Sequence, residues 1–340
     1  MKEEFNIAIV GATGVVGYTM LNILTQRDFP VGEMHLLASE RSAGERIEFG
    51  KRRLMVEVLD DFDFATTDIV LSSAGASVSR AFAPRAVTAG ATVIDNTSAF
   101  RYDADVPLIV PEVNAELVAA GRERGIIANP NCSTIQLVVA LKPLYDAVGI
   151  ERINVATYQS VSGAGKAAIE ELAGQSARLL NGQEIECKVH PKQIAFNVLP
   201  HIDEFQDNGY TREEMKLVWE TRKILGDDSI LVNPTAARVP VFYGHSEAVH
   251  IETAEKITAE DARKLFTGAP GIVVFDERKA GGYATAVTEA AQHDGVFVSR
   301  IREDISHPRG LDFWVVSDNI RKGAALNSVQ IAELLLRELA

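Results

Sequence analysis

The residues best suited to covalent chemistry in this sequence are its two cysteines. Cys132 lies in "NPNCSTIQLVVALKPL", where a short apolar run ends at Asn129-Pro130-Asn131 and an apolar helix is predicted, capped by Asn131 or Ser133. A helix N-terminus stabilises negative charge, so it lowers the pKa of a thiol and raises the thiolate fraction. The position therefore suits a nucleophile, although an intracellular cysteine taken at random is more often a small buried hydrophobe.

A thiolate nucleophile also needs a group that exchanges protons, and histidine does so near neutral pH. His245, in "RVPVFYGHSEAVHIE", follows a glycine at the end of a strand-like segment. Spacing alone does not choose between it and the other candidates, which are His190, His201, His250, His293 and His307. The second cysteine, Cys187, has no setting like that of Cys132, and two cysteines without a CxxC motif predict neither a disulfide framework nor a metal site.

A glycine-rich turn near the N-terminus predicts a second function. The segment "GATGVVG" places Gly11, Gly14 and Gly17 between a predicted strand over 5–10 and a predicted helix over 18–26. Glycines let the backbone approach a phosphate, and the free N–H groups of the helix N-terminus bind it. The spacing is GxxGxxG and not the commoner GxGxxG, and a plain turn with packing glycines is the structural alternative. Its place in the first strand–helix unit favours dinucleotide binding.

The residues after the second predicted strand bear on the choice of dinucleotide. An NAD site expects an acidic residue there, on the ribose 2′-hydroxyl. This chain has "LLASERSAG", with Ser39, Arg41 and Ser42 around Glu40. Hydroxyls and a guanidinium suit a 2′-phosphate, whereas Glu40 would repel one unless it points away. We therefore predict NADP, with a solvated loop charge as the alternative for Arg41.

These residues must be positioned by two different kinds of sheet. Over roughly the first 130 residues, apolar strands alternate with helices, which is typical of a doubly wound parallel sheet of the Rossmann type. The predicted strands there are 5–10, 33–39, 68–75, 91–98, 106–114 and 125–131. Beyond residue 150 the order changes to α+β, with helices over 166–182, 212–225 and 324–339. Strands are predicted over 152–165, 229–241, 246–254, 271–277, 295–304 and 311–319.

Composition limits the class of protein. A chain of 340 residues suggests two domains, and a net charge of −13 without a Lys/Arg-rich block argues against nucleic acid as a partner. No apolar run approaches the roughly 20 residues that span a bilayer, so no membrane partner is expected. The N-terminus lacks a signal-peptide pattern, and with the two cysteines this predicts a cytoplasmic location.

Taken together, the motifs resemble the aspartate-semialdehyde dehydrogenase family along nearly the whole chain. "GATGVVG" is similar to its cofactor loop and "NPNCST" to its nucleophile motif. "YQSVSGAG" with Gln159, "REEMK", and "RVPVFYGHSEAV" with Arg238 and His245 follow in the family's order. "LLASERSAG" and "DNTSAFR" resemble the branch with the shorter cofactor-binding pattern. No matched catalytic position departs from the family.

The resemblance implies an activity: NADPH-dependent reductive dephosphorylation of L-aspartyl 4-phosphate to L-aspartate 4-semialdehyde and phosphate. This step serves lysine, diaminopimelate, threonine, methionine and isoleucine biosynthesis. Cys132 would form a thioester with the acyl group, and His245 would be the general acid/base. Arg238 would hold the substrate α-carboxylate, Arg101 and Lys216 the phosphate, and Gln159 and Glu213 would orient the substrate.

The resemblance also implies the remaining contacts and the assembly. The predicted cofactor residues are Gly11, Thr13, Gly14, Val15, Val16, Ser39, Arg41, Ser42, Ser162, Gly163 and Asn319, with Ser72, Ser73 and Gly75 beside them. Residues 1–131 would form the NADP-binding domain, to which a C-terminal helix within 321–340 returns. Residues 132–320 would form the catalytic domain and hold a homodimer together.

Three alternatives compete with this interpretation. N-acetyl-γ-glutamyl-phosphate reductase uses the same chemistry on a longer acyl phosphate, but its cysteine is usually followed by a Tyr-containing segment, unlike "NPNCSTIQ". A glyceraldehyde-phosphate-dehydrogenase-like enzyme shares the thioester but fits the glycine loop and the Arg238–His245 segment poorly. A non-catalytic NADP-binding paralogue would not need Cys132, Gln159, Arg238 and His245 together.

Overall fold

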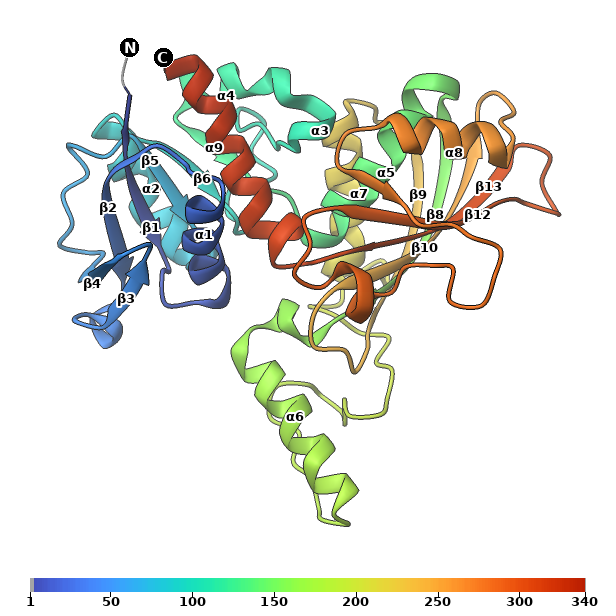
Figure 1. Cartoon of the computed structure of the whole chain (residues 1–340), viewed down its shortest axis with the longest axis horizontal. Helices are drawn as coiled ribbons and strands as arrows, with labels where there is room; N and C mark the ends of the chain where they lie inside the picture. The colour runs from blue at the N-terminus through green and yellow to red at the C-terminus, as the bar shows by residue number, and fades with distance from the viewer. Residues whose placement is uncertain (1–2, 340) are drawn as a thin grey trace. The chain divides into compact units, whose positions relative to one another are not determined.

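A computed structural model describes residues 3–339 of the chain (Figure 1). The chain forms two compact units: one runs to Asn131 and resumes at Ala324, and the other spans Cys132–Gly323. The first contains a mostly parallel sheet with helices, and the second a mixed sheet of α+β order. The predicted fold class is therefore confirmed. No helix among residues 3–339 is long and apolar enough to cross a membrane.

The sheet of the first unit has the strand order β3-β4-β2-β1-β5-β6-β7. Its parallel strands are β1 (Phe5–Val10), β2 (Val31–Ala38), β4 (Arg52–Val58), β5 (Ile69–Ser72), β6 (Thr92–Asp95) and β7 (Ile126–Ala128), and β3 (Arg46–Phe49) pairs antiparallel with β4. Because β1 lies between β2 and β5, the strand order reverses at the end of β1. Ligands of doubly wound sheets bind at such a switch point.

Helices bury the apolar residues of this sheet in one core. They are α1 (Val15–Gln26), α2 (Ala76–Thr88), α3 (Pro111–Asn114), α4 (Val118–Arg124) and α9 (Leu326–Leu339), with short 3₁₀ turns η1 (Glu40–Ser42) and η2 (Ala115–Leu117). Helix α9 packs beside α1 (Figure 1), and Leu326, Val329 and Leu335 join the core formed by β1 and α1. The end of the chain thus completes the first unit.

Two details of this unit differ from the prediction. The strand predicted over 106–114 is wrong: Leu108 makes one isolated bridge, and α3 begins at Pro111. Proline at the first helical position has no N–H to lose, so it starts a helix readily. The hairpin β3–β4 was not predicted, because its charged residues hide the apolar alternation of a half-exposed strand pair.

The sheet of the second unit has the order β11-β12-β13-β10-β8-β9. Its strands are β8 (Ile150–Gln159), β9 (Leu231–Arg238), β10 (His245–Thr253), β11 (Ile272–Val274), β12 (Val296–Glu303) and β13 (Gly310–Ser317). Strands β8 and β9 are parallel, whereas β10 runs antiparallel to both β8 and β13. The carboxyl ends of β8, β9 and β13 and the start of β10 therefore meet at one edge.

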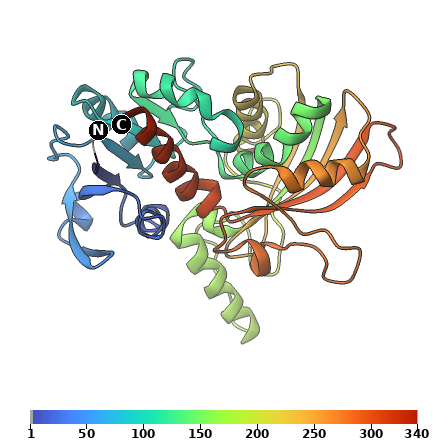
Figure 2. The same cartoon turned by 45° about the horizontal axis from the view of Figure 1, so that its top comes forward.

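Helices α5 (Cys132–Val148), α7 (Arg212–Leu225) and α8 (Ala259–Gly268) pack against this sheet. Alternate residues of β10 are buried beneath them, and the residues between are partly exposed on the other face, where Tyr158, His250 and Trp314 lie. Helix α6 (Lys166–Leu180) stands clear of the sheet (Figures 1 and 2) and has a small core of its own around Leu172 and Ile194. The last regular turns are η3 (Val161–Ala164) and the π-helical η4 (Ala286–Ala290) and η5 (Arg321–Ala325).

Candidate active site

The edge at which β8, β9 and β10 meet collects three of the predicted residues. Gln159 and Arg238 are the last residues of the parallel strands β8 and β9, and they are paired in register. His245 is the first residue of β10 and lies opposite Ser317 at the end of β13. All three side chains are buried. Residues that are 79 and 86 positions apart along the chain (238 − 159; 245 − 159) are thus brought together by strand pairing.

Arg238 connects this edge to the predicted nucleophile. Its Nη1 donates a hydrogen bond to the Ser160 carbonyl at 2.9 Å. Burial lowers the pKa of Arg238, and the nearby charges of Glu213 and Cys132 oppose that shift. A guanidinium stays charged in proteins all the same. Arg238 therefore provides a fixed positive charge close to both Cys132 and a carboxylate.

Cys132 is the first residue of α5, and its thiol is partly exposed. Cys132 therefore lies at the N-terminus of a 17-residue helix, the positive end of its dipole, as predicted from "NPNCST". Ser133 is inside the helix, so of the two residues predicted as caps only Asn131 stands before the first turn. The π-helical turn η5 packs against Cys132 so closely that a Cβ atom on Gly323 would lie 2.8 Å from the Cβ of Cys132.

We predict that Gly323→Ala lowers kcat by about 10- to 100-fold, because the added methyl group must displace the nucleophile, and misplacement by about 1 Å can cost about 100-fold. The matched control is Gly174→Ala. Gly174 lies inside α6, where a Cβ atom would meet nothing within 4 Å. Steady-state rates of both variants test the expectation, and equal activities of Gly323→Ala and the wild type would contradict it.

Gln159, at the sheet edge, is hydrogen-bonded to a cluster of charged side chains around Glu213 and Lys216 on α7. Its Nε2 donates to Glu213 Oε1 at 3.0 Å, and Lys216 Nζ donates to Glu213 Oε2 and to Asp203 Oδ2, both at 2.8 Å. Burial opposes the charge of Lys216, but Glu213 and Asp203 outweigh it, so its pKa is raised. Asp203 was not predicted. Its role arises only when the loop before α7 folds back on Lys216.

His245 is fully buried, and its two ring nitrogens have different surroundings. Nδ1 accepts a hydrogen bond from the backbone N–H of Ser160 at 3.1 Å and lies 3.2 Å from the Ser160 hydroxyl, whereas Nε2 has no hydrogen-bond partner in the described structure. Burial and the charge of Arg238 lower its pKa to about 3, against the opposing effects of Glu213 and the Gly244 carbonyl. The imidazole is therefore neutral at physiological pH.

The three cofactor residues predicted in this unit surround His245. Asn319 Oδ1 accepts hydrogen bonds from the Ser160 hydroxyl at 3.1 Å, the Ser162 hydroxyl at 3.2 Å and the Gly244 N–H at 2.9 Å. A Cβ on Gly163 would lie 3.1 Å from Arg238 Nη1 and 3.4 Å from the His245 ring. Asn319 and Ser162 thus form one hydrogen-bond network with Ser160, whose N–H donates to His245, and Gly163 lies close to both His245 and Arg238. Sequence motifs did not indicate this network.

The predicted dinucleotide loop belongs to the first unit. Gly11 has φ = +84°, and a Cβ on Gly17 would lie 2.3 Å from the Gly11 carbonyl, so glycine is required at both positions. Helix α1 begins at Val15, followed by Val16, and no side chain caps it. The Gly14 N–H donates to the Gly11 carbonyl at 3.0 Å, so the N–H groups available to a phosphate are those of the first turn of α1, after Gly14. The turn over Ser72, Ser73 and Gly75 adjoins this loop, because a Cβ on Gly11 would approach Ala74 to 3.1 Å.

The residues predicted to choose the cofactor form the turn η1 after β2. Ser39, Glu40 and Arg41 are exposed, and Ser42 is partly exposed. Arg101, predicted to bind phosphate, also lies in the first unit. It is buried, and its guanidinium donates to the carbonyls of Asn129 at 2.9 Å and Asn96 at 2.8 Å, which fixes its orientation.

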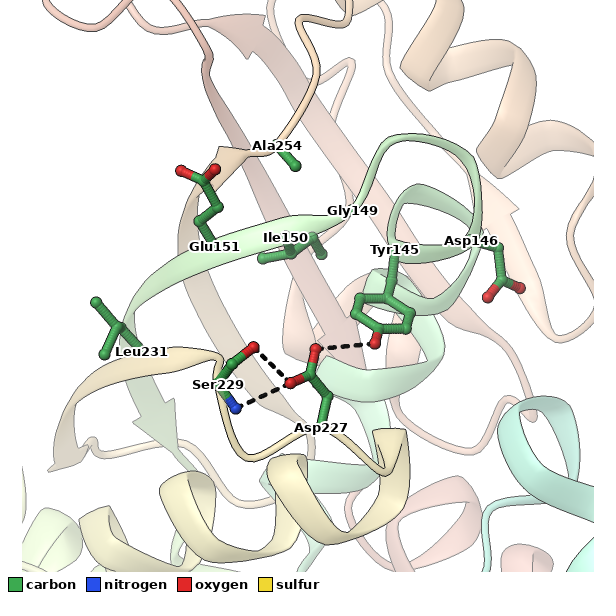
Figure 3. Close-up of a pocket in the computed structure, with 9 residues that line it drawn as sticks. All are labelled: Tyr145, Asp146, Gly149, Ile150, Glu151, Asp227, Ser229, Leu231 and Ala254. Atoms are coloured by element: carbon green, nitrogen blue, oxygen red, sulfur yellow. Dashed lines mark hydrogen bonds between the residues drawn. The ribbon is translucent and has the colours of Figure 1, made fainter.

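A cavity of about 690 Å³ lies elsewhere in the second unit (Figure 3). It is lined by Tyr145, Asp146, Gly149, Ile150, Glu151, Asp227, Ser229, Leu231 and Ala254, none of which is a predicted site residue. The Tyr145 hydroxyl and the Ser229 N–H and hydroxyl all donate to Asp227. With three carboxylates, this cavity is unsuited to an acyl phosphate. Within residues 3–339 no cluster of three or more His, Cys, Asp or Glu side chains could hold a metal ion.

Comparison with known proteins decides the family. The family model described as "Semialdehyde dehydrogenase, NAD binding domain" matches residues 6–120, and "Semialdehyde dehydrogenase, dimerisation domain" matches residues 141–322. The aspartate-semialdehyde dehydrogenase of Shewanella violacea is 61% identical over 338 residues, or 99% of each chain. The chain belongs to the aspartate-semialdehyde dehydrogenase family. The predicted resemblance is therefore confirmed.

Solved structures of aspartate-semialdehyde dehydrogenases have the same fold. Aspartate-semialdehyde dehydrogenase II from Vibrio cholerae, complexed with ASA, is 58% identical with a TM-score of 0.97 and covers 99% of both chains. The aspartate-semialdehyde dehydrogenase of Candida albicans, with NADP, is 27% identical with a TM-score of 0.77 over 98% of both chains. An aspartate-semialdehyde dehydrogenase is an oxidoreductase of amino-acid biosynthesis, and the first family model indicates a nucleotide cofactor.

Proposed function

We propose that the protein catalyses the NADPH-dependent reductive dephosphorylation of L-aspartyl 4-phosphate to L-aspartate 4-semialdehyde. The observation that carries the proposal is the arrangement in the second unit, where Arg238 interacts with Cys132, His245 and Glu213 and lies in register with Gln159. A nucleophile, a fixed cation and a proton-bearing group in one site are the parts that acyl transfer needs.

Cys132 is the proposed nucleophile. Its thiolate attacks the acyl carbon, the C–S bond forms, and the C–O bond to phosphate breaks to leave a thioester. The departing phosphate takes up one proton, and Lys216 and Arg101 are the cations proposed to bind it. Bound NADPH would supply the hydride that reduces the thioester. The C–S bond then breaks, which releases the aldehyde and restores the Cys132 thiolate.

The substrate's amino-acid end is assigned to the buried charges beside Cys132. Arg238 can bind the α-carboxylate through its planar guanidinium, and Glu213, whose charge acts on Arg238, is the carboxylate proposed to pair with the ammonium group. Gln159 is held by Glu213 and orients the substrate from the sheet edge. His245 is the proposed general acid/base, and its Nε2, which has no hydrogen-bond partner in the described structure, is the ring nitrogen available to the substrate.

The first unit fits a dinucleotide, because the glycine turn leaves the α1 N-terminus uncapped for a pyrophosphate. For NADP over NAD, the supporting features are Ser39, Arg41 and Ser42 in an exposed turn, and the Candida albicans relative whose structure contains NADP. We predict that Arg41→Ala raises KM for NADPH about 10- to 100-fold, because losing one hydrogen bond to a charged group weakens binding by about that factor. The KM for NADH should stay unchanged. Arg53→Ala, another exposed arginine of this unit, is the control. An equal effect on both cofactors would contradict the assignment.

The proposal extends to assembly and place of action. The partly exposed sheet face with Tyr158, His250 and Trp314 suits an isologous homodimer contact, and the matching family model is described as a dimerisation domain. A cytoplasmic location and roles in lysine, diaminopimelate, threonine, methionine and isoleucine biosynthesis follow from the proposed reaction.

The reverse reaction tests the proposal. Purified protein is given L-aspartate semialdehyde, phosphate and NADP, beside N-acetylglutamate semialdehyde with the same additions, and NADPH formation is followed. Phosphate-dependent turnover of the aspartate compound alone is expected. Turnover of the acetylated compound alone would indicate the related reductase, and turnover of neither with NADP bound would indicate a non-catalytic paralogue.

A further inference from the structure

Two backbone carbonyls hold Arg101, the buried arginine proposed to bind phosphate. Its Nε donates to the Asn129 carbonyl at 2.9 Å, and its Nη2 donates to the Asn96 carbonyl at 2.8 Å. Nε and Nη2 lie on one edge of the planar guanidinium, so the two bonds together fix its position and the plane in which it lies. The placement of this cation therefore depends on the placement of the two carbonyls.

Asn96 and Asn129 occupy equivalent places at the carboxyl edge of the first sheet. Asn96 directly follows β6 and Asn129 directly follows β7, and the last residues of these paired strands, Asp95 and Ala128, lie opposite each other. The N–H of Asn96 donates to the Ser72 carbonyl at 2.9 Å, and the N–H of Asn129 donates to the Asp95 carbonyl at 2.8 Å. The strands end here, so the two asparagine side chains are the remaining groups that can fix the turns.

Helix α9 supplies a donor to each of these side chains. Asn327 Nδ2 donates to Asn129 Oδ1 at 2.7 Å and to the Ile109 carbonyl at 3.0 Å, and the Ser328 hydroxyl donates to Asn96 Oδ1 at 3.0 Å. Asn327 and Ser328 are fully buried, and they lie 198 and 232 residues along the chain from these asparagines. The arginine, the two asparagines and the start of α9 thus form three successive layers within the first unit.

The residue types at the start of α9 suit this task. The amide nitrogen of Asn327 has two hydrogens, and its two acceptors use both of them. Without it, the buried Oδ1 of Asn129 loses a donor, and a buried acceptor without a donor is costly, so the turn at Asn129 is expected to shift. Asn129 lies three residues before Cys132, so such a shift also reaches the segment that leads to the proposed nucleophile.

We propose that Asn327 and Ser328 are positioning residues for phosphate binding, which act through the two asparagines on the guanidinium of Arg101. The ligand of Arg101 rests on the proposed function, whereas the contacts that hold the guanidinium do not depend on it. Neighbouring residues of α9 belong to the hydrophobic core, which gives the two donors a rigid base. A cation fixed in advance binds an anion without losing freedom of its own, and an error of about 1 Å in its place can be costly to the rate.

Phosphate kinetics of the reverse reaction test these roles. Ser328→Ala is expected to raise KM for phosphate about 3- to 10-fold at nearly unchanged kcat, as the loss of one hydrogen bond does. Asn327→Ala removes two bonds and should raise this KM about 10- to 100-fold and also lower kcat, because Asn129 leads to Cys132. KM for NADP should stay unchanged in both variants. Unchanged KM for phosphate in both would overturn the proposal.

The matched control is Gln330→Ala. Gln330 is another amide side chain of α9, but its Nε2 donates to Glu112 at 3.1 Å. This variant should keep the wild-type KM for phosphate. If it raised that KM as much as Ser328→Ala does, any polar loss from α9 would have the same effect, and the specific roles would be refuted.

A double-mutant cycle separates action through Arg101 from a general loss of structure. In an Arg101→Ala background, Asn327→Ala should change KM for phosphate by less than about twofold, because the side chain that it positions is absent. Equal effects in both backgrounds would overturn the proposal. Thermal unfolding shows whether each variant folds, and Ser328→Ala, the milder change, completes the same cycle if Asn327→Ala does not fold.

The Nε–H signal of Arg101 gives a measurement that needs no turnover. The full-length protein is labelled with ¹⁵N-arginine, and Arg101→Lys identifies the signal. We expect slow exchange with water in the wild type, a shifted or broadened signal in Asn327→Ala and Ser328→Ala, and no change in Gln330→Ala. An unaltered signal in both α9 variants would refute the positioning role, whether or not the enzyme is active.

Failure of the proposed function gives a different result. Inorganic phosphate is added to the same labelled wild-type protein, and the Arg101 signal is expected to move. If it stays in place and Arg101→Ala keeps the wild-type KM for phosphate, Arg101 is not a phosphate ligand, and the role in phosphate binding is refuted. If phosphate moves the signal but the α9 variants do not, the assignment of Arg101 stands and the positioning role alone is refuted.

Discussion

Replacing Cys132 by alanine is expected to lower phosphate-dependent NADPH formation by at least about 10⁴-fold, the scale on which loss of a nucleophile reduces kcat. The thiol lies at the first residue of a 17-residue helix and interacts with the charge of Arg238, and alanine at this position has no nucleophilic group. The rate of NADPH formation from L-aspartate semialdehyde and phosphate measures the effect.

Cys187 provides the matched control for this experiment, because it is an exposed thiol outside the site. Cys187→Ala should keep wild-type rates, and alkylation at neutral pH should label Cys132 first and stop turnover. Thermal unfolding of Cys132→Ala should stay close to that of the wild type, which separates lost chemistry from lost fold. Residual activity above about one per cent in Cys132→Ala would refute the thioester.

The largest expected effect on stability comes from Glu247, two residues after His245 on β10. Its side chain is fully buried, and burial raises its pKa well above the ordinary value of 4.5, despite an opposing interaction with the buried amide of Gln136. Neither carboxylate oxygen, nor either polar atom of Gln136, has a well-formed hydrogen bond in the described structure. Between pH 4.5 and the raised pKa of the folded state, the folded chain therefore holds a neutral carboxyl group where the unfolded chain holds a carboxylate.

This difference gives the pH dependence a definite sign. Below pH 4.5 both states are protonated and the penalty is absent. As the pH rises, the unfolded state gains stability by up to about 1.4 kcal/mol per pH unit, until the folded pKa is reached. Glu247→Gln removes the titration, so we expect it to raise the free energy of unfolding above pH 4.5, and this gain should grow with pH and vanish toward pH 4.5.

Urea unfolding of both proteins across this pH range measures the difference. Glu45→Gln, a change at an exposed glutamate, is the control and should show no such pH-dependent gain. A Glu247→Gln variant that is less stable than the wild type at every pH would mean that the carboxylate is ionised and paired in the fold.

Local patterns in the sequence were enough to predict most helices and strands, but not every residue of the candidate active site. The predicted helix over 212–225 has the observed bounds of α7, because Thr211 and Glu214 form a capping box and Gly226 ends the helix with a left-handed backbone. The motif of Cys132 likewise predicted the start of α5. Both signals lie within a few residues of the feature that they determine.

Local patterns could not predict contacts between segments that are far apart in the sequence. No spacing rule selects His245 over His250, since the choice depends on the pairing of β8 with β10 and on the Ser160 N–H. Gly323 looks like any other glycine until η5 packs against Cys132. The family resemblance supplied the role of His245, whereas the contribution of Ser160 emerged only from the folded chain.

The close packing of Gly323 on Cys132 also has a consequence for the modular construction of the protein. The second unit begins at Cys132 and ends at Gly323, so its two ends adjoin, as in a domain inserted into a host. One uninterrupted segment, 132–323, therefore carries Cys132, the proposed nucleophile, together with Gln159, Arg238 and His245, whereas Arg101 and Ser39 to Ser42 belong to the first unit. An exchange of residues 132–323 between relatives would therefore transfer these four residues together and leave Arg101 and the turn after β2 unchanged.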